Sequence, residues 1–381
     1  MTRESKLSRV KRSRIVPTAL GVGVGVACVF LLYAVLSEMF GVSYYSALAE
    51  VTKGKPIPVL PKLDTADYDR RMLVLALATT TPLDTQSDLT GQATTSTSTS
   101  ATTTPKKVPL WPAKTVYPNA GALLPFNRII AYYGNFYSKG MGVLGEYPED
   151  VVLAKLRAEV ANWEAADPTT PVIPAIHYIL VTAQASAGKD GMYRARMPDS
   201  QIDIALEMAK KVNGIVFIDF QVGLSTLQKE LPVYEDYLKL PNVHVGVDPE
   251  FSMKGGERPG TVIGTFNADD INWVGQYLAG VVRGNNLPPK ILVIHRFTDD
   301  MLTGYKRITP LPEVQIVVDM DGWGFPAKKI NTYNTVVATE PIQFTGFKLF
   351  YKNDTKPPSS GMLTPQEILR LKPRPIYIQY Q

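Results

Sequence analysis

The stretch VHVGVDPEF, residues 243–251, has the pattern of a β-strand that changes character at its end. Three valines alternate with a histidine, a glycine and Asp248, which is the period of two expected when the two faces of a strand meet different surroundings. Pro249 cannot donate to the hydrogen-bond ladder of a central strand, so pairing should stop near Asp248 and leave Glu250 beyond it. The stretch therefore predicts a buried strand that delivers two carboxylates to one edge of a sheet.

The sequence between residues 126 and 381 repeats this kind of strand. Helical segments with apolar stripes alternate with the strands, and one of them begins with a capping box at Thr364 and Glu367. This alternation predicts a (β/α)8 barrel of the TIM type that lacks its last helix, because residue 381 directly follows the eighth strand. An open doubly wound sheet is the alternative, although no G-x-G-x-x-G loop follows the first strand. The eight expected strands are residues 128–134, 172–179, 214–221, 243–248, 290–297, 314–320, 344–351 and 375–380.

The amino-terminal residues have the pattern of a membrane anchor. Residues 1–14 hold six basic side chains and one acidic one, which accounts for the whole net charge of +5. The rest of the chain is balanced, so we expect no nucleic acid partner. Residues 15–36 carry no charge and are long enough to cross a bilayer of about 30 Å. We predict a basic cytoplasmic tail at 1–14, a transmembrane signal anchor at 15–37 in the lipid bilayer, and a cell-membrane protein with its barrel extracytoplasmic.

Two alternatives keep the same topology. In the first alternative, a signal peptidase cleaves after Ala49, which ends a small-x-small sequence typical of such a site, and the anchor is removed. In the other, Cys28 stands where a lipoprotein would carry its lipid, although the apolar residues after it do not fit that class. Cys28 is the one cysteine of the chain, which excludes an intramolecular disulfide.

Residues 38–124 have the composition of a Thr/Ser/Pro-rich linker that is partly disordered. The tract at 93–105 is too polar to repay its ordering entropy and is expected to be a flexible or glycosylated stalk. Residues 67–78 predict one short helix that packs on another part of the chain. Some part of this segment is expected to cover the place of the missing eighth helix. The barrel domain is predicted at residues 125–381.

The polar residues of the strands share one face, which we expect to point into the barrel. The three valines of residues 243–251 suit the helix layer, so the histidine, the glycine and Asp248 point inward. Burying ionisable groups costs several kcal/mol each unless they pair or face a wet pocket. Enzymes of this fold have their sites at the carboxyl ends of the strands, so we predict a functional pocket there. The ionisable residues near these ends are Asp219, Glu250, His295 and Asp321.

Carboxylates around a barrel mouth suit the hydrolysis of a glycosidic bond, because one carboxyl protonates the leaving oxygen and a second acts as nucleophile or base. Glu250 is the expected acid, and Asp248 lies one layer deeper behind it. The second catalytic carboxylate, the partner of Glu250, is expected to be Asp219, Asp319 or Asp321. No cofactor and no metal is expected, and the ligand is expected to be a carbohydrate of the envelope or the environment. The further candidate substrate-binding residues are Tyr132, Tyr133, His177, Tyr178, His295, Trp323, Lys348, Tyr377 and Gln379.

Asp248-Pro249-Glu250 resembles the end of the chitinase-type motif Asp-x-x-Asp-x-Asp-x-Glu of the TIM-barrel glycoside hydrolase superfamily. This resemblance implies that Glu250 is the acid and Asp248 its supporting aspartate. Gly246 and Val243 occupy the positions of the two preceding aspartates, so half of the motif is absent. Other barrel glycosidases place a second glutamate after strand seven, a role that Glu340 would fill only if that strand were residues 335–338.

Three other functions remain open. The barrel would bind glycans without catalysis if its carboxylates served only as contacts. Lys348 would form a Schiff base in an aldolase-like site. A metal-dependent hydrolase would bind a divalent cation, although no H-E-x-x-H motif supports it. The candidate ligands of that cation are Asp248, Glu250, Asp319, Asp321 and His295.

Overall fold

The computed structural model describes Leu60 and residues 62–77 and 109–381. Eight parallel strands form a closed barrel, because the order β1-β11-β10-β9-β7-β5-β4-β2 is completed by a pairing of β1 with β2. Each predicted strand is present, which confirms the TIM-type barrel. The barrel strands are β1 (Arg128–Gly134), β2 (Val172–Ala183), β4 (Ile215–Phe220), β5 (Val243–Val247), β7 (Lys290–Arg296), β9 (Val314–Met320), β10 (Phe344–Leu349) and β11 (Tyr377–Tyr380).

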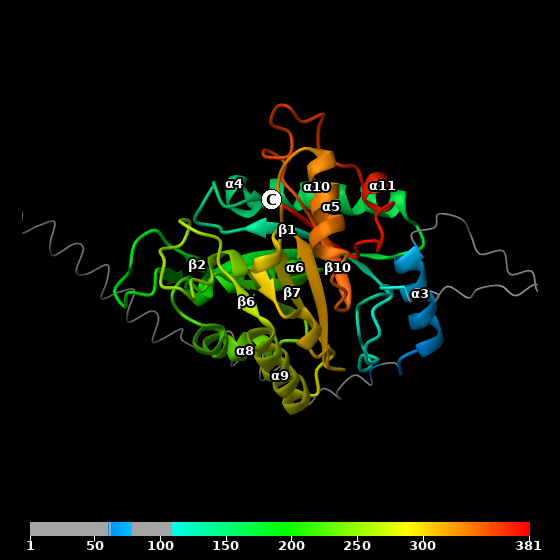
Figure 1. The fold of residues 1–381 in the computed structure, drawn as a ribbon, viewed down its shortest axis with the longest axis horizontal. Helices are drawn as coiled ribbons and strands as arrows, with labels where there is room; N and C mark the ends of the chain where they lie inside the picture. Colours follow the sequence, from blue (N-terminus) through cyan, green and yellow to red (C-terminus); the bar gives the residue numbers. More distant parts are fainter. Residues whose placement is uncertain (1–59, 61, 78–108) are drawn as a thin grey trace, which may run out of the picture. The chain divides into compact units, whose positions relative to one another are not determined.

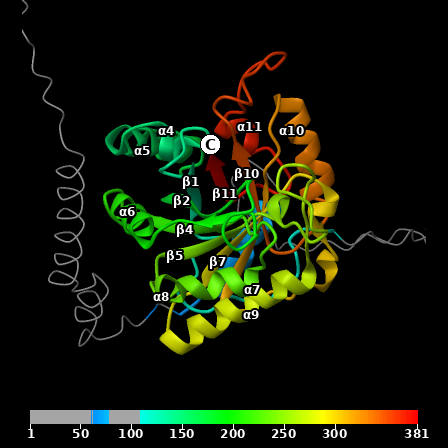
Figure 2. The same cartoon turned by 90° about the vertical axis from the view of Figure 1, so that its left-hand side faces the viewer.

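Helices follow the strands on the outside of the barrel, as Figure 2 shows for α5, α6, α9 and α10. Helix α9 begins at a capping box formed by Asn267 and Asp270 and buries an apolar stripe that includes Val274 and Leu278. A capping box of Thr364 and Glu367 also opens α11, as predicted. The helices are α4 (Val143–Glu146), α5 (Glu149–Ala166), α6 (Asp199–Lys210), α7 (Leu227–Glu230), α8 (Glu235–Leu238), α9 (Ala268–Asn285), α10 (Pro326–Thr332) and α11 (Pro365–Ile368).

Three short strands lie outside the barrel. β3 (Arg194–Arg196) pairs antiparallel with the end of β2, and its arginines contact the buried carboxylate of Glu230. β6 (Phe266–Asn267) and β8 (Leu302–Thr303) pair with each other in parallel. These additions extend the loops at the carboxyl ends of the strands.

The alternation of the strands sorts their residues as predicted. The three valines of β5 are fully buried, while the ring of His244 lies against that of Phe217 at 5.3 Å inside the barrel. A Cβ atom on Gly246 would lie 2.4 Å from Asp219 Oδ1 and from His177 Nε2, so this residue also points inward. An apolar cluster inside the barrel, here called the interior cluster, includes Phe217, Ile291 and Val317. Because Val317 of β9 belongs to it, the other odd-numbered residues of that strand also point inward.

The interior cluster continues below the strands into α3 (Thr65–Leu77). Tyr68 and Met72 pack with apolar residues of the barrel interior such as Ile291 and Phe344, and the backbone N–H of Arg374 donates to Leu75 O at 2.7 Å. The predicted helix at 67–78 is therefore present, and it packs against the amino ends of the strands. Figure 1 shows α3 as the blue helix.

The chain after residue 108 also attaches to the barrel before its first strand. Trp111 Nε1 donates to Ala338 O at 2.7 Å, and the backbone N–H of Asn119 donates to Pro312 O at 2.8 Å. The segments on both sides of residues 78–108 thus pack on the barrel. The predicted stalk falls within those residues and lies outside the part of the chain that the structure describes.

The predicted anchor lies outside the described residues, as do the tail at 1–14, the span at 15–37, Cys28 and the possible cleavage site at Ala49. Among Leu60 and residues 62–77 and 109–381, no helix is long and apolar enough to cross a membrane.

Candidate active site

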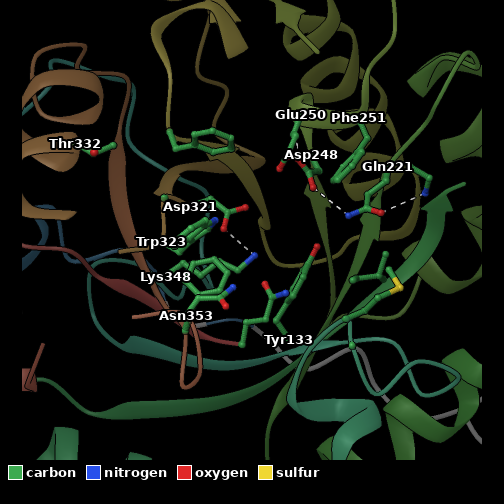
Figure 3. A pocket seen from close by; sticks show the side chains of 18 of the residues that line it. Tyr133, Gln221, Asp248, Glu250, Phe251, Asp321, Trp323, Thr332, Lys348 and Asn353 are labelled. Carbon is green, nitrogen blue, oxygen red and sulfur yellow. Dashed lines mark hydrogen bonds and ion pairs between the residues drawn. The ribbon is translucent and has the colours of Figure 1, made fainter. Parts of the chain in front are cut away.

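A cavity of about 610 Å³ opens at the carboxyl ends of the barrel strands, where the sequence predicted a functional pocket. Figure 3 shows the carboxylates of Asp248 and Glu250 on one side of this cavity, Asp321, Trp323 and Lys348 on another, and Tyr133 beneath them. Each barrel strand supplies at least one lining residue, either from the strand itself or from the position directly after it. In strand order from β1 to β11 these include Tyr133, Ile179, Gln221, Asp248, Phe297, Asp321, Lys348 and Gln381.

The proline after β5 sets the positions of the first two carboxylates. Pairing ends at Val247, and Pro249 begins a single 3-10 turn, Pro249–Phe251. Asp248 caps this turn, because its Oδ1 accepts from the backbone N–H of Glu250 at 3.1 Å. Its Oδ2 accepts from Gln221 Nε2, also at 3.1 Å. Asp248 is thereby fixed at the cavity wall, while the Glu250 carboxyl reaches into the cavity.

The opposite wall carries Asp321, the residue that follows β9. Its Oδ1 lies 2.8 Å from Lys348 Nζ, and both side chains are buried. The Lys348 ammonium also stands 3.9 Å from the centre of the Tyr133 ring, a close cation–π contact. This ion pair holds Asp321 in place and leaves Lys348 in the role of its counter-ion instead of a Schiff-base nucleophile.

The three carboxylates of the cavity affect one another. Burial, with the Asp321 carboxylate next in importance, raises the pKa of Glu250 to about 7, and the opposing charges of Lys348 and His295 offset this only in part. Burial also raises the pKa of Asp248, to which the carboxylates of Glu250 and Asp321 add. Glu250 is therefore a carboxyl that keeps its proton near neutral pH, which is the property of a general acid.

A layer of buried polar residues lies beneath the cavity. Asp219 Oδ2 accepts from the Tyr133 hydroxyl at 2.8 Å, and its Oδ1 faces His177 Nε2 at 3.5 Å and His295 Nε2 at 3.6 Å. His295 Nδ1 lies 3.4 Å from both Asp319 Oδ2 and Asp321 Oδ2, so Asp321 joins this layer to the cavity.

The same layer has strongly shifted acidities. Burial lowers the pKa of His177 to about 4. Burial alone would raise the pKa of Asp219 and lower that of His295, but each is next to an opposite charge, so the pKa of Asp219 falls and that of His295 rises. The shifts of Asp219 and His295 are therefore opposite in direction, and each has the other residue among its causes.

Several predicted site residues belong to this layer. Asp219 and Asp319, two of the three carboxylates considered as partners of Glu250, are fully buried and do not line the cavity, whereas Asp321 does. Four of the residues expected to bind substrate also lie one layer below the cavity. The residues concerned are His177, His295, Tyr377 and Gln379.

Tyr132 and Tyr178 were also expected to bind substrate, but neither residue lines the cavity. The Tyr132 hydroxyl hydrogen-bonds that of Tyr351 at 2.8 Å, and the Tyr178 ring stacks on Phe136 at 4.7 Å, in each case away from the cavity. The reason is the alternation of the strand, since a strand that points Tyr133 into the barrel points its neighbour to the helices.

Trp323 is the exposed aromatic side chain at the mouth, with 53% of its surface accessible. Lys328 Nζ stands 5.0 Å from its ring centre.

Glu340 precedes β10 and pairs with Arg296, so it does not occupy the position of the second glutamate that other barrel glycosidases carry after strand seven. Four further residues line the cavity and were not expected from the sequence: Phe251, Phe297 and Asn353, which follow β5, β7 and β10, and Lys328, which lies in α10.

The alternative metal set of the sequence analysis is not assembled, because Asp248, Glu250 and Asp321 line the cavity while His295 and Asp319 lie below it. In the part of the chain that the structure describes, the residues that bring ligand atoms together are His177, Asp219 and His295.

Comparisons with known proteins give weak likenesses. No family model and no curated protein matches the chain. Among solved structures it is similar to Cellulase Cel5C_n, with 13% identity and a TM-score of 0.33, over 58% of this chain and 65% of the cellulase. It is similar to a hyperthermophilic endo-β-1,4-glucanase in complex with substrate, with 9% identity and a TM-score of 0.37, over 67% and 89% of the two chains.

A further likeness is to a GH5-4 broad specificity endoglucanase from an uncultured bacterium, with 8% identity and a TM-score of 0.28, over 58% of this chain and 77% of that one. The fold assignment itself rests on the strand order.

Proposed function

We propose that the protein hydrolyses a glycosidic bond, with Glu250 as the general acid and Asp321 as the second carboxylate. The observation that supports this most is that the two side chains enter one cavity from the carboxyl ends of different strands, β5 and β9. Two carboxyl groups flanking a cavity of this kind are the minimum that glycoside hydrolysis needs.

The environments of the two carboxyls suit different roles. The pKa of Glu250 is raised to about 7, first by burial and then by the Asp321 carboxylate, so Glu250 can donate a proton to the leaving oxygen. Asp321 forms an ion pair with Lys348 at 2.8 Å, and we assign it the role of nucleophile or base. Asp248 touches Gln221 and the backbone of Glu250, and we assign it the positioning of the acid.

We infer that the ligand is a glycan of the envelope or the environment, bound against the exposed ring of Trp323. An aromatic face next to polar groups is suited to a sugar ring, which has apolar C–H faces and hydroxyl edges.

The cellular location is part of the same proposal. The uncharged residues 15–36 after a basic tail support an anchor in the cell membrane with the barrel outside.

The test is a screen of the purified full chain against cell-wall and plant glycans, followed by release of reducing ends. Glu250→Gln is expected to lower kcat about 10²- to 10⁴-fold, the usual contribution of a general acid, while its folding is retained. Glu257→Gln, an exposed glutamate in the loop after β5, is the matched control and should keep full activity. An active Glu250→Gln enzyme would refute the assignment, and a wild type that binds glycans without cleaving them would identify a binding module.

A pH profile tests the same role independently. Because Glu250 must be protonated to act as an acid, kcat/KM should fall about tenfold per unit above about pH 7. A profile that stays flat to pH 9 would argue against Glu250 as the acid.

A further inference from the structure

The buried layer beneath the cavity contains a second, separate arrangement of ligand atoms. His177, Asp219 and His295 come from β2, β4 and β7 and are fully buried. One donor atom of each lies within 4.8 Å of the other two. Two of these separations, from Asp219 Oδ1 to the Nε2 atoms of His177 and His295, are 3.5 and 3.6 Å.

These atoms have no other partner. In the described part of the chain, His177 Nε2, Asp219 Oδ1 and His295 Nε2 make no hydrogen bond. Leaving such buried groups unpaired costs about 1–3 kcal/mol each. Three such atoms that face one another point to a ligand that accepts their lone pairs.

The opposite atom of each residue lies next to a second polar group. His177 Nδ1 hydrogen-bonds the Tyr377 hydroxyl at 2.6 Å, and Asp219 Oδ2 accepts from Tyr133. His295 Nδ1 faces the Asp319 carboxylate at 3.4 Å. Metal-binding residues are oriented in this way, with the second imidazole nitrogen turned to a carboxylate or another polar group.

Gly246 leaves space next to two of the donor atoms. A Cβ atom here would lie 2.4 Å from both Asp219 Oδ1 and His177 Nε2. Any larger residue at this position of β5 would therefore fill the space that a bound ion needs.

We propose that His177, Asp219 and His295 bind one divalent transition-metal ion, with Zn²⁺ as the expected species, inside the barrel below the active-site cavity. Two imidazoles and a carboxylate are ligands that zinc prefers, and zinc bonds of about 2.0–2.2 Å in a tetrahedral arrangement place donor atoms about 3.4 Å apart. The sequence analysis expected no metal, and the proposal departs from it. The ion would tie three strands together beneath the cavity, and this role does not depend on the proposed hydrolysis.

The experiment measures zinc in the full chain, expressed in zinc-supplemented medium and purified without a polyhistidine tag. Mass spectrometry of the metal content should find about one zinc per chain in the wild type. His177→Gln and Asp219→Asn should hold less than about a tenth of that. Asp319→Asn should weaken zinc binding about 10- to 100-fold, because it removes an outer partner of His295.

Two control variants separate this site from others. His244→Asn removes a buried barrel histidine whose Nδ1 accepts from the backbone N–H of Ile291, and it should keep its zinc. Glu250→Gln should also keep it, which distinguishes the buried site from the cavity. Replacement of zinc by Co²⁺ should give visible absorption bands in the wild type and none in Asp219→Asn.

The wild type alone is decisive if the ligand variants fail to fold. Removing zinc with a chelator should lower its Tm, and adding zinc should restore it. A wild type that stays free of zinc after growth and refolding in its presence would overturn the proposal, as would full zinc content in Asp219→Asn.

Discussion

The most demanding prediction concerns stability at the proposed acid, Glu250. Its pKa is raised from an ordinary value of 4.5 to about 7, first by burial and then by Asp321. Between these two pH values the folded protein holds a proton that the unfolded chain has lost, so the free energy of unfolding decreases as the pH rises. Each pH unit in this window costs about 1.4 kcal/mol, which sums to about 3 kcal/mol.

Glu250→Gln removes this dependence because an amide does not titrate. The variant is therefore expected to gain about 3 kcal/mol relative to the wild type between pH 4 and pH 8, while it loses catalysis. Urea unfolding followed by circular dichroism at both pH values measures the difference. Glu257→Gln is the control, since an exposed carboxylate is hydrated in both states and its replacement should leave the difference unchanged.

The result that would refute this reasoning is a difference between wild type and Glu250→Gln that is the same at pH 4 and pH 8. It would mean that the Glu250 carboxyl is solvated in the folded protein, and the argument for its role as a proton donor would lose its basis.

Three further predictions follow from individual contacts. Gly246→Ala should lower the free energy of unfolding in urea by about 1–3 kcal/mol, because the added Cβ meets packed side chains. Gly280→Ala, in an open position of α9, is the control and should raise that free energy by about 0.5–1 kcal/mol. Equal effects of the two substitutions would contradict the predicted crowding at Gly246. Lys348→Met should lower the free energy of unfolding by about 3–5 kcal/mol, because Asp321 is left buried without its counter-ion. A decrease of less than about 1 kcal/mol would show that the ion pair is solvated. Trp323→Ala should raise KM about 2- to 10-fold on a cleaved glycan with Tm unchanged, and an unchanged KM would exclude stacking there.

Much of the barrel could be predicted because each strand carries its own local pattern. The period of two in β5 and β9 was enough to place Asp248, Asp319 and Asp321 on the inner face, and the structure confirms this. The same rule, applied to β1 and β2, would have excluded Tyr132 and Tyr178, whose neighbours point inward.

The depth of each side chain could not be predicted in the same way. Asp319 and Asp321 share a face of β9, yet only the second lines the cavity, because depth depends on how far each strand extends relative to its neighbours. The pairing of Asp321 with Lys348 depends equally on the stagger between β9 and β10, which no single strand encodes. The packing of α3 beneath the barrel is a long-range contact of the same kind.

Under the proposed membrane anchoring, that packing would shorten the linker available between the anchor and the barrel. With the predicted anchor at residues 15–37, a free linker of residues 38–124 would reach about 300 Å when fully extended, at about 3.3–3.6 Å per residue. Because α3 and the chain after residue 108 are both attached to the barrel, only residues 38–59 are left to act as a tether, and their full length is about 75 Å. A membrane-anchored form of this protein would therefore be confined to glycans in a thin layer next to the bilayer.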